Sequence, residues 1–336
     1  MAWKYTEDTI PTDFSKNTFD LYLEYICDKL QIKDHTKFLL SRVDDYHKHT
    51  FFIVDMDLKP VWVLKAINPE SWDNTINMIG REIEISAYAY GLLPKMKPRK
   101  ILALEYDHEK KWGIICYNYL GPAFTSEDDS MAINTWATEI YKVLFELHQK
   151  TVSDFFGFGQ FSPIYPEKFS DSASYSFRFL LRDIVRDGFI EKDIITKYIR
   201  EKWTPKLEQT KKNVLTHADI TLSNVILTGP KIKDLTLIDW TYSLWQNPAY
   251  DLANVLFWHI RFNGKEEALA QIEELIPKYK LLCIDIGESF PCFLARKFLD
   301  YGRFNQKQLR GHAVNLLNMD NFNDVKRYLL EHKVFV

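Results

Sequence analysis

The sequence predicts an α+β protein with a strand-rich first part and a mostly helical second part. Short β-prone runs divided by polar turns occupy much of residues 37–117. Apolar stripes with helical spacing follow, first over residues 133–147 and then over most of the chain after Asp251. With 336 residues, the chain is long enough for two domains and a large buried core.

The first part is expected to hold a helix, an antiparallel meander and a second helix. An i, i+3, i+4 apolar stripe predicts the opening helix, with the residues Phe19, Tyr22, Leu23, Ile26 and Leu30. Three β-prone runs predict the meander, at residues 37–40, 50–54 and 61–67. Residues 72–93 then have the pattern of a helix that ends just before a proline.

Two further strands, at residues 100–104 and 112–117, complete the first part. The stretch Asn118–Pro122 then interrupts the pattern with a glycine and a proline. We expect the connection between the two parts here, which divides the chain into residues 1–118 and 119–336.

The segment from Leu215 to Asp251 contains the most informative pattern. Its apolar runs 225–227 and 235–238 are separated by a turn with Gly229 and Pro230, which predicts two antiparallel strands. Asn224 stands just before the first strand and Asp239 just after the second, so the two side chains should face each other. Their hard oxygen atoms suit a magnesium ion bound to nucleotide phosphates. Asp219 would lie across the loop, where it can meet a substrate hydroxyl.

The strings HADITLSN and LTLIDW, within residues 215–240, resemble the HxDxxxxN and IDxxx signatures of the aminoglycoside phosphotransferase and choline kinase superfamily. The resemblance implies a bilobal protein-kinase-like fold, with a small nucleotide-binding lobe and a larger, mostly helical catalytic lobe. It also implies roles for individual residues. Asp219 is the catalytic base or orienting group, Asn224 and Asp239 hold Mg²⁺, His217 braces the loop, and Asp251 is a structural aspartate near the start of a helix.

Each of these residues also has an ordinary structural explanation. Asp219 and Asn224 could cap turns, Asp239 could end a strand, and His217 could be a core histidine. For a single residue the structural explanation is the better one. The ordered set with a hairpin between its members favours the functional interpretation, although for His217 we expect a structural role.

Lys65 is the expected contact to the α- and β-phosphates of the nucleotide, and Glu82 supports nucleotide binding as its partner. Lys65 is one lysine among apolar neighbours in the third strand, the setting of the kinase strand lysine. Glu82 is its expected partner, and Glu84 is the alternative because helix phase is uncertain by a residue or two. A lysine on the solvent face of an edge strand and an exposed helical glutamate are the structural alternatives.

The resemblance further implies that the connection between the lobes binds the base of ATP (or GTP) through backbone groups. Tyr117 and Tyr119 are chosen only by their position there. Ile226 and Ile238, which flank the predicted hairpin, are candidates for the apolar walls around the base.

One stretch departs from the family pattern. The loop expected to cover the phosphates corresponds to residues 41–49, which contain no glycine, so backbone N–H groups cannot approach phosphate as easily. Asp44 and Asp45 would repel phosphate unless they point away. Ser41, Arg42 and Lys48 are the candidates to compensate, and Ser41 is taken as a nucleotide-binding residue.

Composition argues against several other classes of protein. The formal net charge of −3 gives no basic excess of the kind that nucleic-acid-binding proteins have. The four cysteines are scattered without a CxxC pair, which argues against a zinc site or a disulfide framework. No signal-peptide pattern and no run of 18 apolar residues occurs. We therefore expect a cytoplasmic protein without a nucleic-acid, membrane or obligate protein partner.

The leading functional hypothesis is an ATP-dependent kinase that phosphorylates a hydroxyl group of a small molecule. A protein kinase is less favoured, because only eleven residues separate Asp239 from Asp251, too few for the segment that positions a peptide. A weak or inactive nucleotide-binding pseudokinase or scaffold is the alternative, supported by the loop without glycine.

Two features of the sequence bear on the acceptor. Aromatic residues could stack a sugar or surround a quaternary ammonium, whereas an acidic stretch could attract a polycationic aminoglycoside. A choline- or ethanolamine-type kinase is a less favoured alternative. Core packing and a solvated loop are the structural alternatives. The resulting expectation is an antibiotic or amino-sugar alcohol. The aromatic residues are Trp240, Tyr242, Trp245, Tyr250 and Trp258, and the acids are Glu127, Asp128 and Asp129.

Overall fold

The computed structural model describes most of the chain. The described residues are residue 28 and the ranges 41–44, 48–54, 59–67, 72–107, 109, 112–121, 130–153, 159–160, 177–209, 212–227, 235–304 and 308–335. The chain divides into two compact units. The first contains residues 1–83 and 98–121, and the second contains residues 84–97 and 122–336. The functional division at residue 118 stays a prediction.

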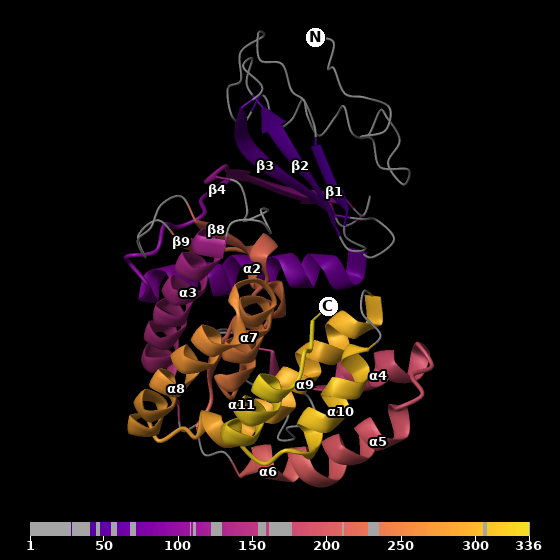
Figure 1. Cartoon of the computed structure of the whole chain (residues 1–336). Helices are drawn as coiled ribbons and strands as arrows, with labels where there is room; N and C mark the ends of the chain where they lie inside the picture. Colours follow the sequence, from indigo (N-terminus) through magenta and orange to yellow (C-terminus); the bar gives the residue numbers. More distant parts are fainter. Residues whose placement is uncertain are drawn as a thin grey trace. The chain divides into compact units, whose positions relative to one another are not determined.

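The first unit is built on a five-stranded antiparallel sheet with the strand order β1-β2-β3-β5-β4 (Figure 1). This confirms the predicted sheet. The opening helix predicted around residues 19–30 and the strand at 37–40 lie outside the described residues, apart from residue 28, which is helical. The strands are β1 (Ser41–Asp44), β2 (Lys48–Val54), β3 (Pro60–Ile67), β4 (Ile101–Asp107) and β5 (Trp112–Asn118).

The predicted loop over residues 41–49 is largely strand, which corrects the sequence-based boundary. Strand β1 pairs with β2 from Ser41 opposite Phe52 to Asp44 opposite His49. Val43 faces Thr50 in this register, so β-branched residues continue the ladder where the sequence suggested a loop. The connection between β1 and β2 is reduced to residues 45–47, which lie outside the described residues.

The predicted helix over residues 72–93 is confirmed as α2 (Trp72–Leu92). Its buried positions include Glu82, Ile85 and Ala89, which follow the spacing of one helix face. In the sheet, β3 lies between β2 and β5, so Lys65 belongs to a central strand, and its exposed fraction is only 3%. The edge-strand explanation for this lysine is therefore excluded.

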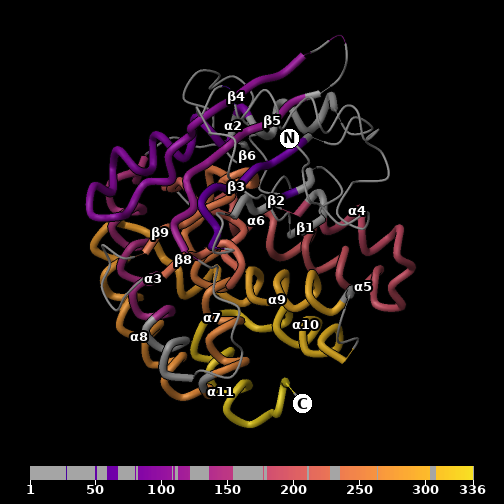
Figure 2. The backbone as a smooth tube through the Cα atoms, turned by 90° about the horizontal axis from the view of Figure 1, so that it is seen from above, coloured from indigo at the N-terminus to yellow at the C-terminus, as the bar shows by residue number. Residues whose placement is uncertain are grey.

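The second unit is mostly helical, as predicted (Figure 1). Helix α9 packs against both α7 and α10, and α3 packs against α7; Figure 2 shows α9 and α10 running side by side. The helices are α3 (Ser130–Thr151), α4 (Arg178–Arg186), α5 (Lys192–Lys197), a π-helical turn (Tyr198–Trp203), α6 (Thr204–Glu208), α7 (Ala249–Asn263), α8 (Lys265–Leu281), α9 (Ile286–Phe304), α10 (Leu309–Asn318) and α11 (Phe322–Glu331).

Short strands carry the sequence motif within the second unit. Strand β10 (Leu244–Gln246) pairs with β7 (Val214–Thr216) on one side and with β6 (Gly159–Gln160) on the other. Strands β8 (Val225–Leu227) and β9 (Leu235–Leu237) form the predicted antiparallel hairpin. The turn with Gly229 and Pro230 lies outside the described residues.

Apolar packing holds these elements together. The aromatic side chains of Trp136, Trp203, Trp240, Phe257 and Phe298 are fully buried in one large cluster. Among the described helices, none combines the length and the apolar character required to cross a lipid bilayer.

Candidate active site

The loop after β7 carries His217, Ala218 and Asp219, and its backbone takes an unusual conformation. Ala218 has φ of 67°, in the left-handed region that residues with a Cβ atom rarely adopt. Asp239, at the end of the β8–β9 hairpin, has φ of 64°. Left-handed backbone at non-glycine residues persists only where surrounding contacts hold it, and such positions concentrate at functional sites. The contacts around these residues therefore decide the shape of the site.

Asp251 holds the loop in this conformation. Its carboxylate is fully buried near the start of α7, the position expected from the sequence. Oδ2 accepts a hydrogen bond from the His217 N–H and Oδ1 accepts one from the Ala218 N–H, both at 2.8 Å. Two consecutive backbone donors thus point at one carboxylate, which fixes the turn that leads to Asp219.

A buried histidine and a tyrosine support this carboxylate from behind. His148, on α3, places Nε2 3.3 Å from Asp251 Oδ2 and Nδ1 2.7 Å from the hydroxyl of Tyr279. A carboxylate only accepts, so the imidazole carries its proton on Nε2 and donates it to Asp251. Nδ1 is then an acceptor for the hydroxyl of Tyr279, whose pKa is raised well above its ordinary value by burial.

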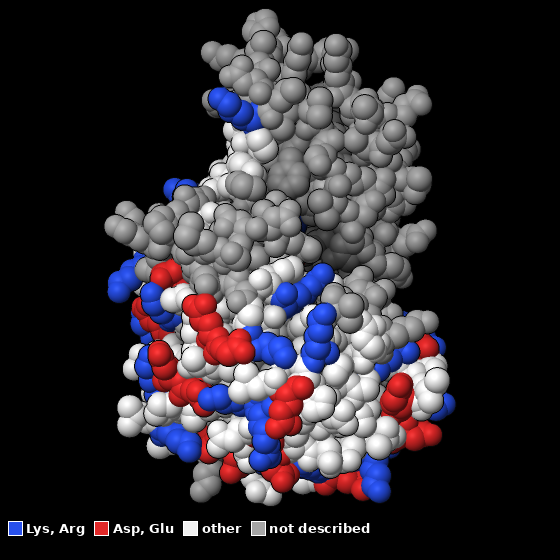
Figure 3. Space-filling view, viewed as in Figure 1, with Lys and Arg blue, Asp and Glu red and all other residues white. Residues whose placement is uncertain are grey.

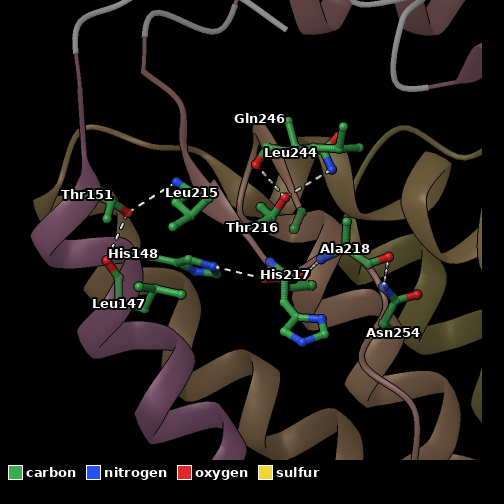
Figure 4. A network of polar contacts seen from close by, with 12 residues as sticks. Leu147, His148, Thr151, Leu215, Thr216, His217, Ala218, Leu244, Gln246 and Asn254 are labelled. Atoms are coloured by element: carbon green, nitrogen blue, oxygen red, sulfur yellow. Dashed lines mark hydrogen bonds and ion pairs between the residues drawn. The ribbon is translucent and has the colours of Figure 1, made fainter. Parts of the chain in front are cut away.

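Further hydrogen bonds attach β7 and the loop to three other elements. Thr151 Oγ1, on α3, accepts from the Leu215 N–H at 3.1 Å, and Thr216 Oγ1 donates to the Leu244 carbonyl of β10 at 2.8 Å. Asn254, on α7, donates to the Ala218 carbonyl at 3.4 Å. Figure 4 shows His148, Thr151 and Asn254 flanking the chain from Leu215 to Ala218.

His217 connects the loop to the hairpin. Its Nε2 lies 3.0 Å from the Ile238 carbonyl, and its Nδ1 accepts a weak hydrogen bond of 3.4 Å from the Asp219 N–H. A neutral ring protonated at Nε2 satisfies both contacts. The ring also lies 4.6 Å from the Trp240 ring, between centroids. In this structure His217 therefore has the contacts of a positioning residue.

Asn224 and Asp219 are bonded directly to each other. Asn224 Nδ2 donates to the backbone carbonyl of Asp219 and to its Oδ2, both at 2.9 Å. The Asn224 carbonyl accepts from the Ile238 N–H at 2.9 Å, which places Asp239 one residue beyond this pair. Asp239 Oδ1 in turn accepts from Thr241 Oγ1 at 2.6 Å. The hairpin thus brings the amide and both predicted acids into one neighbourhood.

Electrostatics make Asp219 a stronger base than an exposed aspartate. Burial raises the pKa of its carboxyl group, and the negative charge of Asp239 acts in the same direction. The positive charge of Lys297 and the hydrogen bond from Asn224 oppose the increase. The net pKa shift is upward, which is the direction expected for a carboxylate that accepts a proton during catalysis.

Lys65 and Glu82 form the predicted ion pair within the first unit. Lys65 Nζ lies 2.8 Å from Glu82 Oε1 and 3.1 Å from Oε2, and both side chains are buried. Tyr117 donates its hydroxyl proton to Glu82 Oε1 at 3.5 Å, and its ring lies 5.7 Å from Lys65 Nζ. Removal of either partner would leave the other charge buried and unpaired, which is strongly destabilising. Glu84, the alternative partner, is only half-buried.

The residues chosen for binding the base are placed less favourably. Tyr117 is buried in β5, and its ring packs against the guanidinium of Arg99 at 4.1 Å. The Tyr119 N–H is already bonded to the Val61 carbonyl at 3.0 Å, so this donor is occupied. Burial raises the pKa of Tyr119.

The other proposed nucleotide contacts are only partly accessible. Ile226, in β8, is buried, and Ile238 is half-buried beside the hairpin. Ser41 lies in strand β1 and not in a loop. The roles of these residues in nucleotide binding stay predictions.

Sequence reasoning missed the residues that act on the site from a distance. His148 and Tyr279 lie 103 and 28 residues from Asp251, so no local pattern connects them. Arg296 and Lys297, on α9, interact electrostatically with Asp219 and were also missed. The one available signal was the adjacent cation pair itself, set between the apolar pairs Leu294-Ala295 and Phe298-Leu299 of α9.

The fold and the site together define a protein-kinase-like phosphotransferase. The model of the phosphotransferase enzyme family (APH) matches residues 41–276, and the chain belongs to this family. It is thus an ATP-dependent phosphotransferase that acts on a hydroxyl group. A comparison with curated protein sequences gave no match.

Solved structures share the fold at low sequence identity. Aminoglycoside phosphotransferase APH(4)-Ia is 15% identical with a TM-score of 0.61, over 89% of this chain and 98% of that one. The ethanolamine kinase of Plasmodium vivax is 16% identical with a TM-score of 0.57, over 94% and 88%. The enzyme APH(2")-IIia in complex with GDP and kanamycin is 14% identical with a TM-score of 0.56, over 91% and 99%.

Replacing Asp251 with asparagine should destabilise the chain. The variant keeps one acceptor oxygen but presents an NH₂ group to a backbone N–H or to His148, so at least one buried donor loses its partner. We expect the free energy of unfolding in urea to fall by about 3 kcal/mol. The exposed Asp193→Asn, on α5, should stay within about 0.5 kcal/mol of wild type. Equal stability of the two variants would contradict the anchoring role of Asp251.

Replacing Asp219 with asparagine should change how stability depends on pH. The pKa of Asp219 is higher in the folded chain than in the unfolded chain. Its contribution to stability is therefore fully present at a pH below its pKa in the unfolded chain, and is lost as the pH rises through its pKa in the folded chain. Asp219→Asn does not titrate, so it should become more stable relative to wild type as the pH rises across that interval. Urea unfolding at a series of pH values measures this difference. A difference that does not vary with pH would rule out the raised pKa.

Proposed function

We propose that this chain transfers the γ-phosphoryl group of ATP to a hydroxyl group of a small molecule, with Asp219 as the catalytic base. The observation that carries the proposal is the loop held by Asp251, which presents Asp219 bonded to Asn224 and close to Asp239. The acceptor oxygen attacks the γ-phosphorus, the bond to the β–γ bridging oxygen breaks, and ADP leaves. Asp219 orients the acceptor hydroxyl and takes its proton.

The residues around Asp219 fit a magnesium ion. Asn224 uses its Nδ2 to bond Asp219, which leaves the amide Oδ1 as the atom for a cation. Asp239 adds a carboxylate, oriented by Thr241. One or two protein oxygens are enough for Mg²⁺, which keeps waters and binds phosphate oxygens for its remaining positions. When bound, the ion would neutralise charge on the phosphates.

Lys65 is the proposed contact to the α- and β-phosphates. Its ion pair with Glu82 supports this role, because the pair fixes the ammonium group and both partners are buried. A lysine held by a helical glutamate is the arrangement that kinases require for activity. The donor is ATP, with GTP as the alternative. Cysteines 116, 283 and 292 are free thiols, which fits the reducing cytoplasm as the proposed location.

A weak or inactive nucleotide-binding protein is the second candidate. The specific observation is the glycine-free connection between β1 and β2, where residues 45–47 are Asp-Tyr-His. A protein kinase is disfavoured, since a 3₁₀ turn (Trp240–Tyr242) and strand β10 occupy the interval from Asp239 to the start of α7. That interval contains no segment long enough to support a peptide.

The acceptor is a small molecule, and the features that suggested an aminoglycoside carry little weight. Trp240, Trp245 and Tyr250 are buried core residues, whereas Tyr242 is exposed and Trp258 is partly exposed. The acidic stretch at residues 127–129 lies outside the described residues.

Turnover should require both Mg²⁺ and Asp219. We expect ADP release from ATP in the presence of an accepted hydroxyl compound, measured by a coupled assay. Asp219→Asn should lower kcat by roughly two to four orders of magnitude, the usual contribution of a general base. Asp193→Asn should behave as wild type. Nucleotide binding by the wild-type chain without any turnover that depends on Asp219 would favour the inactive candidate instead.

Substitutions of the proposed metal ligand Asp239 and of Lys65 should have different kinetic effects. Asp239→Asn should raise the Mg²⁺ concentration needed for half-maximal rate, because one carboxylate charge is lost. Lys65→Met should raise the KM for ATP and lower kcat, whereas Lys278→Gln, an exposed lysine of α8, should change neither. An Asp239→Asn enzyme with an unaltered Mg²⁺ requirement would contradict the metal assignment.

A further inference from the structure

Two adjacent cations on α9, Arg296 and Lys297, interact electrostatically with the proposed catalytic base Asp219. Arg296 Nη1 lies 3.2 Å from Asp300 Oδ2, and its guanidinium packs over the Tyr250 ring at 4.4 Å from the centroid. These contacts fix the plane of the guanidinium. Its buried Nε has no hydrogen-bond partner among the described residues. A guanidinium has five N–H donors, so Arg296 can donate to a ligand while its ion pair with Asp300 holds it in place.

Lys297, the next residue, has even fewer partners. Within the described part of the chain its ammonium group makes no hydrogen bond or ion pair, and its Nζ lies 5.7 Å from the centre of the Trp258 ring. Burial lowers the pKa of Lys297, and the charges of Asp219 and Asp300 oppose that decrease. A partly buried ammonium with no bonded carboxylate is costly, and an anionic ligand would offset this cost.

The local charge balance leaves room for an anion. Arg296 and Lys297 contribute two positive charges, and Asp300 neutralises one of them through its ion pair. Asp219 is the other acid that both cations sense. In the proposed reaction Asp219 accepts a proton, so its charge is not a permanent counterion. Once Asp219 has taken the proton, one of the two positive charges has no counterion, and an anionic group on the acceptor would compensate it.

An aromatic surface continues from the two cations. Trp258 and Phe262, on α7, stack at 6.0 Å between centroids, and Tyr301, on α9, meets Trp258 edge-on at 5.6 Å. All three side chains are partly exposed. Arg261 packs among them, with its guanidinium 5.5 Å from the Trp258 ring. This surface suits the apolar face of a ring or a sugar carbon skeleton.

We propose that the acceptor is a hydroxyl compound with a carboxylate or phosphate group, and that Arg296 and Lys297 bind this anionic group while Asp219 faces the hydroxyl. The inference rests on the proposed function and names its substrate class. It also replaces the expectation of an aminoglycoside, because two cations beside the base repel a polycationic acceptor. Over the face of the second unit visible in Figure 3, charges of both signs are mixed.

The γ-phosphate of the nucleotide is the competing source of negative charge. Lys65 and the proposed metal ligands Asn224 and Asp239 already serve the phosphates in the proposed function. Arg296 and Lys297 lie on α9 against the rings of Tyr250 and Trp258, and aromatic surface of this kind suits a carbon skeleton better than a chain of phosphates. We therefore assign the two cations to the acceptor, and the experiment distinguishes the two sources.

The test compares acceptors that differ mainly in charge. Purified full-length chain with ATP and Mg²⁺ is assayed for ADP release with D-gluconate, D-glycerate and glycerol 3-phosphate, against their neutral counterparts D-glucose and glycerol. Ethanolamine and kanamycin are the cationic members. We expect the anionic compounds to give a kcat/KM at least roughly tenfold above their neutral counterparts, the value of one charge-assisted hydrogen bond.

Variants then assign the preference to the two residues. Lys297→Gln and Arg296→Gln should each reduce the ratio of kcat/KM between gluconate and glucose toward one, and Lys297→Arg should restore most of it, because the charge returns. Lys278→Gln removes the same charge on α8 and should leave the ratio unchanged. The ratio of kcat/KM between the two acceptors does not depend on how much of a variant is folded, because both values scale with the amount of folded enzyme.

A binding measurement covers the case in which no compound of this panel is phosphorylated. Trinitrobenzenesulfonate labels accessible lysines of the intact chain, and mass spectrometry follows Lys297. Gluconate or glycerol 3-phosphate should slow its labelling several-fold without nucleotide, and glucose or glycerol should not. Equal rates with charged and neutral compounds would overturn the inference.

Kinetic outcomes can also overturn it. A preference for ethanolamine or kanamycin would do so, as would a Lys297→Gln variant that raises the KM for ATP while keeping the acceptor ratio. Failure of the proposed function gives a different result. ATP would then not be turned over with any acceptor, although anions would still slow the labelling of Lys297.

Discussion

One buried carboxylate determines the geometry of the site. Asp251 accepts the two consecutive backbone N–H groups of His217 and Ala218 at 2.8 Å, and so holds Ala218 in the left-handed region. This conformation costs about 1–2 kcal/mol for a residue with a Cβ atom. Two charge-assisted hydrogen bonds contribute about 1.5–3 kcal/mol each, which is enough to hold the turn. The direction in which Asp219 leaves the loop therefore depends on a side chain 32 residues later in the sequence.

The anchor is rigid because it is supported on its far side. Asp251 is fully buried and bonded to His148, which is bonded to Tyr279, so a chain of hydrogen bonds runs from α8 through α3 and α7 to the loop. A buried carboxylate without such partners would favour its neutral form. Residues of three helices thus hold one turn in place. This explains why the polar groups of Asp251, His148 and Tyr279 lie within an otherwise apolar core.

The sequence predicted what local pattern controls and missed what long-range packing controls. The hairpin of β8 and β9 followed from strand runs, the pairing of Lys65 with Glu82 followed from the resemblance to the family, and the structure contains both. The family pattern placed the stretch from Ser41 to Asp44 in a phosphate-covering loop, whereas these residues pair with β2 as a strand, a contact that local sequence does not reveal. His148 escaped notice, since its partners lie 103 and 131 residues away. No periodicity within one helix can indicate such contacts.

The electrostatics of Asp219 connect the base to the proposed acceptor. Burial and Asp239 raise the pKa of this carboxyl group, whereas Lys297 and Asn224 lower it. An anionic group bound at Lys297 would cancel part of the positive charge that Asp219 senses. The pKa of Asp219 would then rise further, so the carboxylate would become a stronger base when the acceptor is in place. A neutral acceptor leaves Lys297 uncompensated and the base weaker. In this arrangement the charge that recognises the acceptor also adjusts the group that removes its proton.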